Sequence, residues 1–354
     1  NRANGNNDGI DLMNTRHVFI SDCSLMCEDD CICFQDMSDD LPVQDIVITN
    51  CVMSTRWAAI RSGGAHRGGI RNVAVSNCVI RDTYGCGIKL QISGNGVMEN
   101  MTFSNIVMEN VSCPISLRLG NHHYNGEKRD SAFPFGAMRN ILFNNIRASV
   151  LDEAALKKAV ASLYAAHSTT PRTAYPGEER QCISICGIPG HPVQGVTLSD
   201  VHVTYPGGGT REDAARHDLP EMEDQYPEYF MWGVLPAYGL YARHARGVSL
   251  HNVRFDLARP DLRPAVTCDD VEDVTVSHLR AAANPEADSL IRLQCTRDAW
   301  IHGCSPMGQA GTFLRAEGAA CRDVAVGGND LHRTRKAVET ADGANAGVVK
   351  VLGP

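Results

Sequence analysis

The chain repeats one short phrase at nearly regular intervals. The phrase reads ISDCSL from residue 20, ITNCVM from 48, VSNCVI from 75 and FSNIVM from 103, and it returns as FNNIRA from 143, LSDVHV from 198, LHNVRF from 250 and VSHLRA from 276. The fourth position of the first four phrases falls at residues 23, 51, 78 and 106, so the intervals are 28, 27 and 28 residues. A fixed period of this length is the signature of a repeat architecture, and it constrains the fold more than any other feature of the chain.

A second phrase runs in step with the first. It reads DDCICF from residue 29, WAAIRS from 57, GCGIKL from 85, SCPISL from 112 and QCISIC from 181. Each repeat therefore holds at least two short β-type runs between Gly, Asn and Asp turns, with no room for a helix. This pattern predicts an all-β, right-handed parallel β-helix, in which like residues of successive coils stack about 4.8 Å apart. A β-propeller is the alternative, but its blades need about 40–45 residues.

We expect a single β-helix domain over residues 1–354, with insertions at about 121–137, 147–180 and 205–237. Residues 151–166 have apolar side chains at helical spacing and predict the one helix of the chain. The third position of the first phrase is Asn or Asp, which predicts a hydrogen-bonded ladder at a turn. The ladder residues are Asp22, Asn50, Asn77, Asn105, Asn145, Asp200 and Asn252.

Composition excludes several classes of function. The net charge of −8 and pI near 5.9 argue against nucleic acid as a partner, and the chain has no apolar window long enough to span a membrane. Of the fourteen cysteines, Cys23, Cys51 and Cys78 share one position in the phrase, which favours stacked interior thiols over a disulfide framework. No CxxC pair flanks a second one, so we expect no structural zinc site.

Aligning the second phrase on its isoleucine predicts an inward column of Ile10, Ile32, Ile60, Ile88 and Ile115. Asp8 and Asp30 each lie two residues before a member of this column, so their side chains stack on neighbouring coils. Asp29 lies beside them and, as a neighbouring strand residue, is expected to face differently. Three carboxylates so close together raise at least one pKa, which marks a candidate functional site.

The residue after each column member is expected to point outward. This places Cys33, Arg61, Lys89 and Ser116 in one strip, with Arg118 two residues further on. One interpretation is that the cations form solvated ion pairs with the aspartates. The other is a groove that holds an acidic or polyhydroxyl ligand against a general acid and base. Trp57 and Tyr84, on flanking turns, offer either sugar-stacking surfaces or ordinary packing.

The run NNDGID followed by EDDCI, on this coil repeat, resembles glycoside hydrolase family 28, the polygalacturonases and rhamnogalacturonases, whose pattern is NTDGID followed by GDDCI. The later stretch from YPEYFMWG to TCDDV is similar to bacterial members of uncharacterised specificity, so the resemblance covers nearly the whole chain. It implies a hydrolase without cofactor or metal, and it implies that the N-terminal coils of the family are absent here. In the family mechanism, the residue matching Asp29 protonates the glycosidic oxygen, while those matching Asp8 and Asp30 activate the attacking water with inversion. Inverting enzymes hold acid and base about 6.5–9.5 Å apart.

The chain departs from the family pattern in two segments. The GHG segment of the family aligns with TRWAAIRSG, so its histidine is replaced by Arg56 or displaced. The RIK segment aligns with GIKL, which keeps Lys89 and replaces the arginine by Gly87. Arg61, on the neighbouring coil, could supply the missing guanidinium for a uronate carboxylate. His66 and Tyr124 are further candidates for the groove lining, and His122 with His123 fits a loop role better than a metal site.

The resemblance and the stacking together predict an exo-acting, inverting glycoside hydrolase on a uronate-containing, pectin-like polysaccharide or oligosaccharide, because large insertions would narrow one end of a groove. A β-helix lyase or epimerase, commonly calcium-dependent, and a non-catalytic carbohydrate-binding homologue are the alternatives. Relatives are usually exported, whereas unpaired cysteines also suit a reducing cytosol, so the compartment stays open, as does the oligomeric state.

Overall fold

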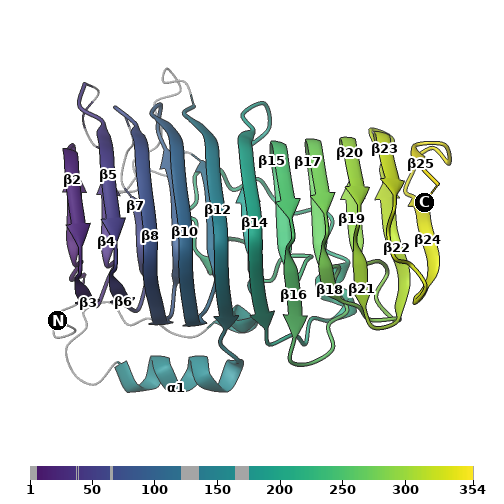
Figure 1. Cartoon of the computed structure of the whole chain (residues 1–354), viewed down its shortest axis with the longest axis horizontal. Coiled ribbons are helices and arrows are strands. Elements are labelled where there is room, and N and C mark those ends of the chain that lie inside the picture. The colour runs from purple at the N-terminus through teal and green to yellow at the C-terminus, as the bar shows by residue number, and fades with distance from the viewer. Residues whose placement is uncertain are drawn as a thin grey trace.

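The computed structural model describes residues 6–36, 38, 40–63, 67–120, 135–163 and 175–353, without the side chains of 159–163. Strands pair in parallel from one end of the chain to the other. Figure 1 shows them standing side by side in sequence order, with the N-terminus at one end of the stack and the C-terminus at the other. The predicted right-handed parallel β-helix is confirmed. The single-domain division stays a prediction.

The strands are short in the first coils and longer in the middle of the stack. They are β1 (Ile10–Met13), β2 (Arg16–Ser21), β3 (Ser24–Met26), β4 (Ile32–Gln35), β5 (Val43–Thr49), β6 (Val52–Ser54), β7 (Ala58–Gly63), β8 (Ile70–Thr83), β9 (Cys86–Ser93), β10 (Val97–Val111), β11 (Ile115–Gly120) and β12 (Ala137–Val150). After the helical insertion they continue as β13 (Ile183–Cys186), β14 (Val193–Tyr205), β15 (Leu240–His251), β16 (Arg254–Leu257), β17 (Val266–Ser277), β18 (Arg280–Ala282), β19 (Ile291–Gln294), β20 (Arg297–His302), β21 (Ser305–Met307), β22 (Ala310–Glu317), β23 (Arg322–Gly327), β24 (Thr334–Ala341) and β25 (Val349–Val351).

The interior is built from columns of apolar side chains. Ile10 pairs with Ile32, Ile32 with Ile60, Ile60 with Ile88, and Ile88 with Ile115, as the repeat predicted. All of these except the first are fully buried. Burying one such side chain contributes about 1.5–3 kcal/mol, so each added coil strengthens the core by a similar amount.

Asparagine ladders hold the bends between strands. The ladder residues lie in left-handed backbone, where Asn and Asp are tolerated, with φ of 54° at Asn77 and 55° at Asn105. Asn105 donates to Asn77 at 3.1 Å, and Asn145 donates to Asn105 at 2.9 Å. The predicted ladder is present. A second one, which the sequence analysis missed, joins Asp45, Asn72, Asn100 and Asn140.

All fourteen cysteines are free thiols, and all except Cys23 and Cys295 are buried. Cys51 lies between Cys23 and Cys78 on successive coils, in the register set by the pairing of β3, β6 and β8. Burial raises the pKa of Cys78 to about 11, so this thiol stays protonated and behaves as a small apolar side chain.

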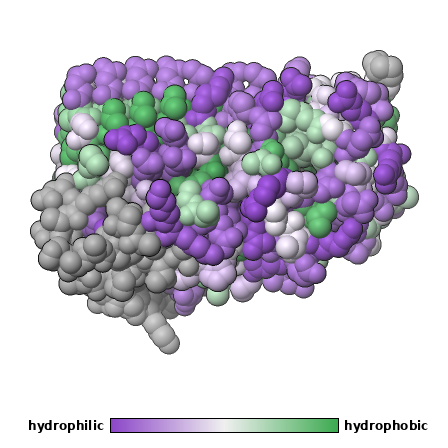
Figure 2. Space-filling model, turned by 90° about the horizontal axis from the view of Figure 1, so that it is seen from below, coloured by the Kyte–Doolittle hydropathy of each residue, from purple (hydrophilic) through white to green (hydrophobic). Residues whose placement is uncertain are grey.

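The described helices lie outside the coils. The longest, α1 (Glu153–Leu163), begins near the predicted position and lies beside one edge of the N-terminal half of the stack (Figure 1). The others are the single turns η1 (Glu178–Arg180), α2 (Arg211–Ala214) and α3 (Tyr229–Trp232), of which the last two belong to the 205–237 insertion. No described helix is long and apolar enough to cross a membrane. The face seen in Figure 2 is mostly hydrophilic, with a short row of hydrophobic residues toward the N-terminal end.

Candidate active site

Three aspartates from two neighbouring coils converge at the N-terminal end of the described stack. The backbone N–H of Gly9 donates to the carbonyl oxygen of Asp30 at 2.9 Å, which sets Asp8 and Asp30 in the same register position. One carboxylate oxygen each from Asp8, Asp29 and Asp30 lie within 4.8 Å of one another. The stacking of Asp8 on Asp30 is therefore observed directly.

Two expectations about this cluster are wrong. Asp29 was expected to face away from Asp30, but residues 28–31 precede β4 and are not a strand, so side chains do not alternate there. Asp29 turns into the cluster instead, while its neighbour Glu28 is buried in an ion pair with Arg56. The closest oxygens also lie within 4.8 Å, which is shorter than the span of about 6.5–9.5 Å expected between acid and base.

The carboxylates open into a pocket of about 470 Å³, which falls within the range of small-molecule sites of about 300–1,000 Å³. Its floor and walls are polar. The lining residues are Asn6, Asn7, Asp8, Asp11, Asp29, Asp30, Cys33, Gln35, Arg61 and Gly63. Gln35 is fixed by donating to Asp11 at 3.0 Å. The predicted catalytic residues and Arg61 are thus found together in one pocket.

Two of the three carboxyl groups hold their protons unusually tightly. Burial, followed by the negative charges of Asp30 and Asp29, raises the pKa of Asp8 to about 8. Burial and the charge of Asp30 likewise raise the pKa of Asp29 to about 7, although Arg61 opposes the change. At mildly acidic pH both groups can donate a proton, which is the property that a general acid requires.

Asp30 is held rigidly as the partner of a cation. Only 2% of the residue is exposed. One carboxylate oxygen accepts from the backbone N–H of Ala58 at 2.9 Å, and the other accepts from Nη1 of Arg61 at 2.8 Å. The charged donor and the fixed backbone donor hold the Asp30 carboxylate in one orientation within the cluster.

The predicted basic strip is not an open surface. Arg61, Lys89 and Arg118 leave the interior of the coils as expected, but all three are buried. Residues 221–232 of the third insertion, here termed the covering segment, lie over them. Nζ of Lys89 forms an ion pair with Glu228 of this segment, and the ring centre of Tyr226 lies 4.9 Å from both Lys89 Nζ and Arg61 Cζ.

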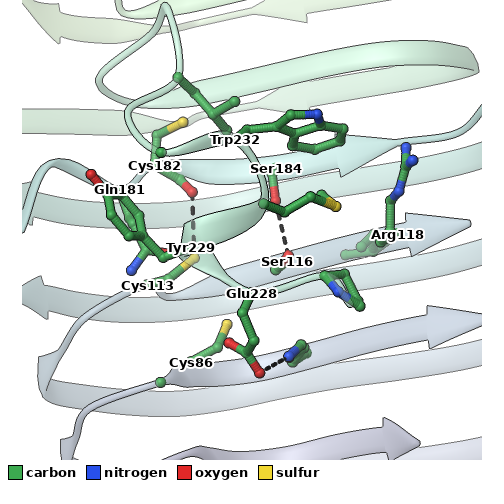
Figure 3. A pocket seen from close by; sticks show the side chains of 17 residues that line it. Cys86, Cys113, Ser116, Arg118, Gln181, Cys182, Ser184, Glu228, Tyr229 and Trp232 are labelled. Atoms are coloured by element: carbon green, nitrogen blue, oxygen red, sulfur yellow. Dashed lines mark hydrogen bonds and ion pairs between the residues drawn. The ribbon is translucent and has the colours of Figure 1, made fainter. Parts of the chain in front are cut away.

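The same segment covers Arg118. The guanidinium donates to the carbonyl oxygens of Gly187 at 2.7 Å and Glu221 at 2.6 Å, and it lies 4.7 Å from the ring centre of Trp232. Figure 3 shows Glu228 pointing from the segment toward the strands, with Trp232 and Arg118 farther along. The cavity left beneath the segment is only about 50 Å³, enough for one or two waters and too small for a sugar. Neither solvated ion pairs nor an open groove describes the strip.

The remaining candidate residues lie outside the pocket lining. Arg56 is buried against Glu28, so it does not reach the pocket. Trp57 is half-buried and Tyr84 is buried, and neither lines the pocket. His66, Tyr124, His122 and His123 lie outside the residues that the structure describes.

Two pocket features were missed by the sequence analysis. The first is Asp11, which directly follows Ile10 just as Arg61 follows Ile60. The rule that the residue after each column isoleucine points outward would have predicted the position of Asp11 as well. Among the described residues, two groups have the spacing for a metal ion, namely Asp8 with Asp29 and Asp30, and Asp8 with Asp11 and Cys33. The oxygens of these groups suit a hard cation such as Ca²⁺.

Comparisons with known proteins agree with the motifs. Residues 1–166 match the model of the family described as glycosyl hydrolases family 28, whereas the predicted resemblance covered nearly the whole chain. A probable polygalacturonase of Arabidopsis thaliana is 32% identical over 132 residues, which are 36% of this chain and 27% of that protein. A second one is 27% identical over 163 residues, 43% of this chain and 34% of that protein.

A fungal relative matches a shorter stretch. A probable endo-xylogalacturonan hydrolase A of Aspergillus fumigatus is 32% identical over 107 residues, 28% of this chain and 25% of that protein. The matched segments therefore span between a quarter and about a third of the length of these relatives.

Proposed function

We propose that the protein is an inverting glycoside hydrolase that removes units from the end of a uronate-containing, pectin-like polysaccharide or oligosaccharide. The observation that carries this proposal is the convergence of Asp8, Asp29 and Asp30 in one pocket of sugar-accommodating size. The match of residues 1–166 to the glycosyl hydrolase family, and the relatives named for polygalacturonase and xylogalacturonan hydrolase activity, supports the substrate class.

The roles of the carboxyl groups follow from their environments. Asp29, with its pKa raised to about 7, is protonated at acidic pH and donates its proton to the glycosidic oxygen. Asp8, with its pKa raised to about 8, is protonated at acidic pH, and it lies beside the Asp30 carboxylate that Arg61 holds in an ion pair.

A water held between Asp8 and Asp30 then attacks the anomeric carbon. Oxygens within 4.8 Å of each other can both accept from a single water, since each hydrogen bond spans about 2.8 Å. The water gives one proton to the pair, its hydroxyl bonds to the anomeric carbon, and the leaving oxygen takes the proton of Asp29. A single displacement inverts the anomeric configuration. The support for inversion is therefore the division of roles, with Asp8 and Asp30 acting on the water and Asp29 acting as the acid, rather than the distance between the carboxylates.

The covering of the basic strip supports attack at a chain end. The outward row continues from Arg61 and Lys89 through Ser116, Ser184, Tyr241, Thr267 and Arg292. The third insertion covers this row, since Thr267 donates to Pro236 and Arg292 donates to Ala214. A polysaccharide therefore cannot continue along the strip toward the C-terminal coils, and the pocket is closed on that side.

The test is a panel of pectic oligosaccharides with product anomers followed by NMR. We expect inverted products and release of units from one end. Retained anomers would exclude the single displacement. Unsaturated products, seen by their ultraviolet absorbance and lost with a chelator, would favour a lyase, and binding without turnover by the wild type would favour a carbohydrate-binding role.

A further inference from the structure

We propose that Glu228 is a specificity-determining residue, and that it restricts the carboxylate pocket to a sugar unit with an uncharged C6 group. Within a pectin-like polymer, that unit is a neutral sugar or a methyl-esterified uronate. This inference rests on the proposed function and adds the charge of the unit that is bound. The argument starts from two cations, Arg61 in the pocket lining and Lys89 beside it on the next coil, and from the partners that each already has.

Lys89 is already neutralised by the protein. Its side chain is 3% exposed and forms an ion pair with Glu228, whose side chain is 12% exposed. A uronate carboxylate would have to take the place of the Glu228 carboxylate, and Glu228 would then be left buried without its cation. Leaving one member of a buried pair unpaired is strongly unfavourable, so the protein carboxylate outcompetes the substrate carboxylate.

Arg61 is engaged in the same way. Its Nη1 donates to Asp30, and its guanidinium lies against the Tyr226 ring. Nζ of Lys89 lies 4.9 Å from the centre of the same ring, so Tyr226 packs against both cations. The positive charge of Arg61 is matched by Asp30, and it is not available to compensate a further anion.

The position of Glu228 is fixed from both sides. Its backbone N–H donates to Tyr226 at 2.8 Å, and it precedes the first residue of α3. The hydroxyl of Tyr229 donates to Pro176 at 2.7 Å, and Nε1 of Trp232 donates to Pro220 at 2.8 Å. The carboxylate is therefore presented to Lys89 by an anchored turn rather than by a free loop end.

The charge of the pocket points in the same direction. Asp8, Asp11, Asp29 and Asp30 line it, and Arg61 is the one cation in the described lining. Arg61 is already paired with Asp30, so a carboxylate at C6 of the bound sugar would find no unpaired cation in the described lining. A charged unit would therefore lose its hydration without gaining an ion pair, whereas an ester or a hydroxymethyl group meets no such penalty.

The experiment compares trigalacturonate with its fully methyl-esterified form at pH 5.5, since the two differ in charge and share sugars and linkages. We expect kcat/KM of the wild type to be about tenfold or more higher for the ester than for trigalacturonate. Glu228→Gln should reduce this ratio by about tenfold, because Lys89 loses its partner and can then pair with a carboxylate of trigalacturonate. Glu221→Gln is the matched control, because it removes another carboxylate of the covering segment that pairs with Arg243. It should leave the ratio of acid to ester unchanged.

The double variant Lys89→Met with Glu228→Gln tests whether the change runs through Lys89, since it should lose the gain on the acid. A wild type that prefers the acid, or equal ratios in Glu228→Gln and Glu221→Gln, overturns the inference. If the wild type hydrolyses neither trisaccharide, dissociation constants by calorimetry decide. If the ester then binds more tightly, the inference about Glu228 holds although the proposed hydrolysis fails. Equal binding of the two, tighter binding of the acid, or no binding of either overturns the inference.

Discussion

Glu228 reaches Lys89 across 139 residues of sequence and joins the third insertion to a strand of the N-terminal coils. The same carboxylate lies close enough to Asp29 to raise its pKa further, after burial and the charge of Asp30. One residue of an insertion therefore influences both the cation beside the pocket and the proposed acid.

The pH profile should report this influence. Asp29 must be protonated to act as the acid, so activity falls as the pH rises through its pKa of about 7. Removing the negative charge in Glu228→Gln lowers that pKa, and the alkaline limb of kcat should move about half a pH unit toward lower pH. Glu221→Gln should leave the limb in place, and an unmoved limb in Glu228→Gln would contradict the placement of Glu228 near the acid.

Asp29→Asn should remove the proton donor without disturbing the fold. Asp29 is only half-buried and lies outside the interior columns, so we expect thermal unfolding near the wild-type temperature at pH 5. Turnover should fall by about 10²–10⁴-fold, the range that general acid catalysis contributes. Turnover within tenfold of wild type would show that another group is the acid.

Asp8 should make stability depend on pH. Its pKa is about 8 in the folded protein against an ordinary value of 3.8, so the folded state binds the proton more tightly than the unfolded state. The resulting stabilisation is complete below pH 4 and is lost as the pH rises through 8. Melting temperatures of Asp8→Asn and wild type should therefore diverge with pH, with the variant gaining about 2–4 °C relative to wild type between pH 5 and pH 8. A constant difference would mean that Asp8 ionises normally.

Arg61→Met should destabilise the protein strongly, because it leaves the buried carboxylate of Asp30 without its cation. We expect a loss of about 3–5 kcal/mol in the free energy of unfolding by urea. The matched control is Arg139→Met, which breaks an ion pair with Glu99 on the surface and should cost about 1 kcal/mol or less. Similar losses in both variants would show that the buried pair of Arg61 with Asp30 contributes no more to stability than a surface pair.

Asn105 tests the ladder. It lies at φ 55°, donates to Asn77 and accepts from Asn145. Asn105→Ala loses both bonds and places an alanine in left-handed backbone, which costs about 1–2 kcal/mol beyond the lost bonds. Asn105→Gly also loses both hydrogen bonds, but glycine adopts the left-handed backbone without a steric cost. Chemical denaturation should therefore show a smaller loss in the free energy of unfolding for Asn105→Gly than for Asn105→Ala. Equal losses would assign the whole effect to the hydrogen bonds.

The fold and the acid cluster were predictable because they depend on local spacing. The period of the phrases fixes which residues stack, and Asp8 and Asp30 hold equal offsets from Ile10 and Ile32. The alternation rule failed for Asp29 because it applies only inside strands. Asp45, Asn72, Asn100 and Asn140 form a ladder that the phrases do not contain, so repeat matching on the phrases alone could not find it.

The burial of the basic strip was not predictable in the same way. The sequence marks residues 205–237 as an insertion but carries no spacing that relates Glu228 to Lys89, or Trp232 to Arg118. These contacts depend on how a non-repeating segment folds over the coils, and nothing periodic in the chain records that path.

The covering segment also ties together coils that a plain solenoid leaves independent. Stacked repeats contact only their neighbours, so such a structure can fray one turn at a time from either end. Here Glu221 bonds Arg118 of β11 through its carbonyl and Arg243 of β15 through its carboxylate, while Arg292 of β19 bonds the insertion at Ala214. These contacts join the coils in the middle of the stack into one cooperative unit. The backbone amides of that unit should exchange with solvent together, whereas β23, β24 and β25 should each exchange through separate local openings.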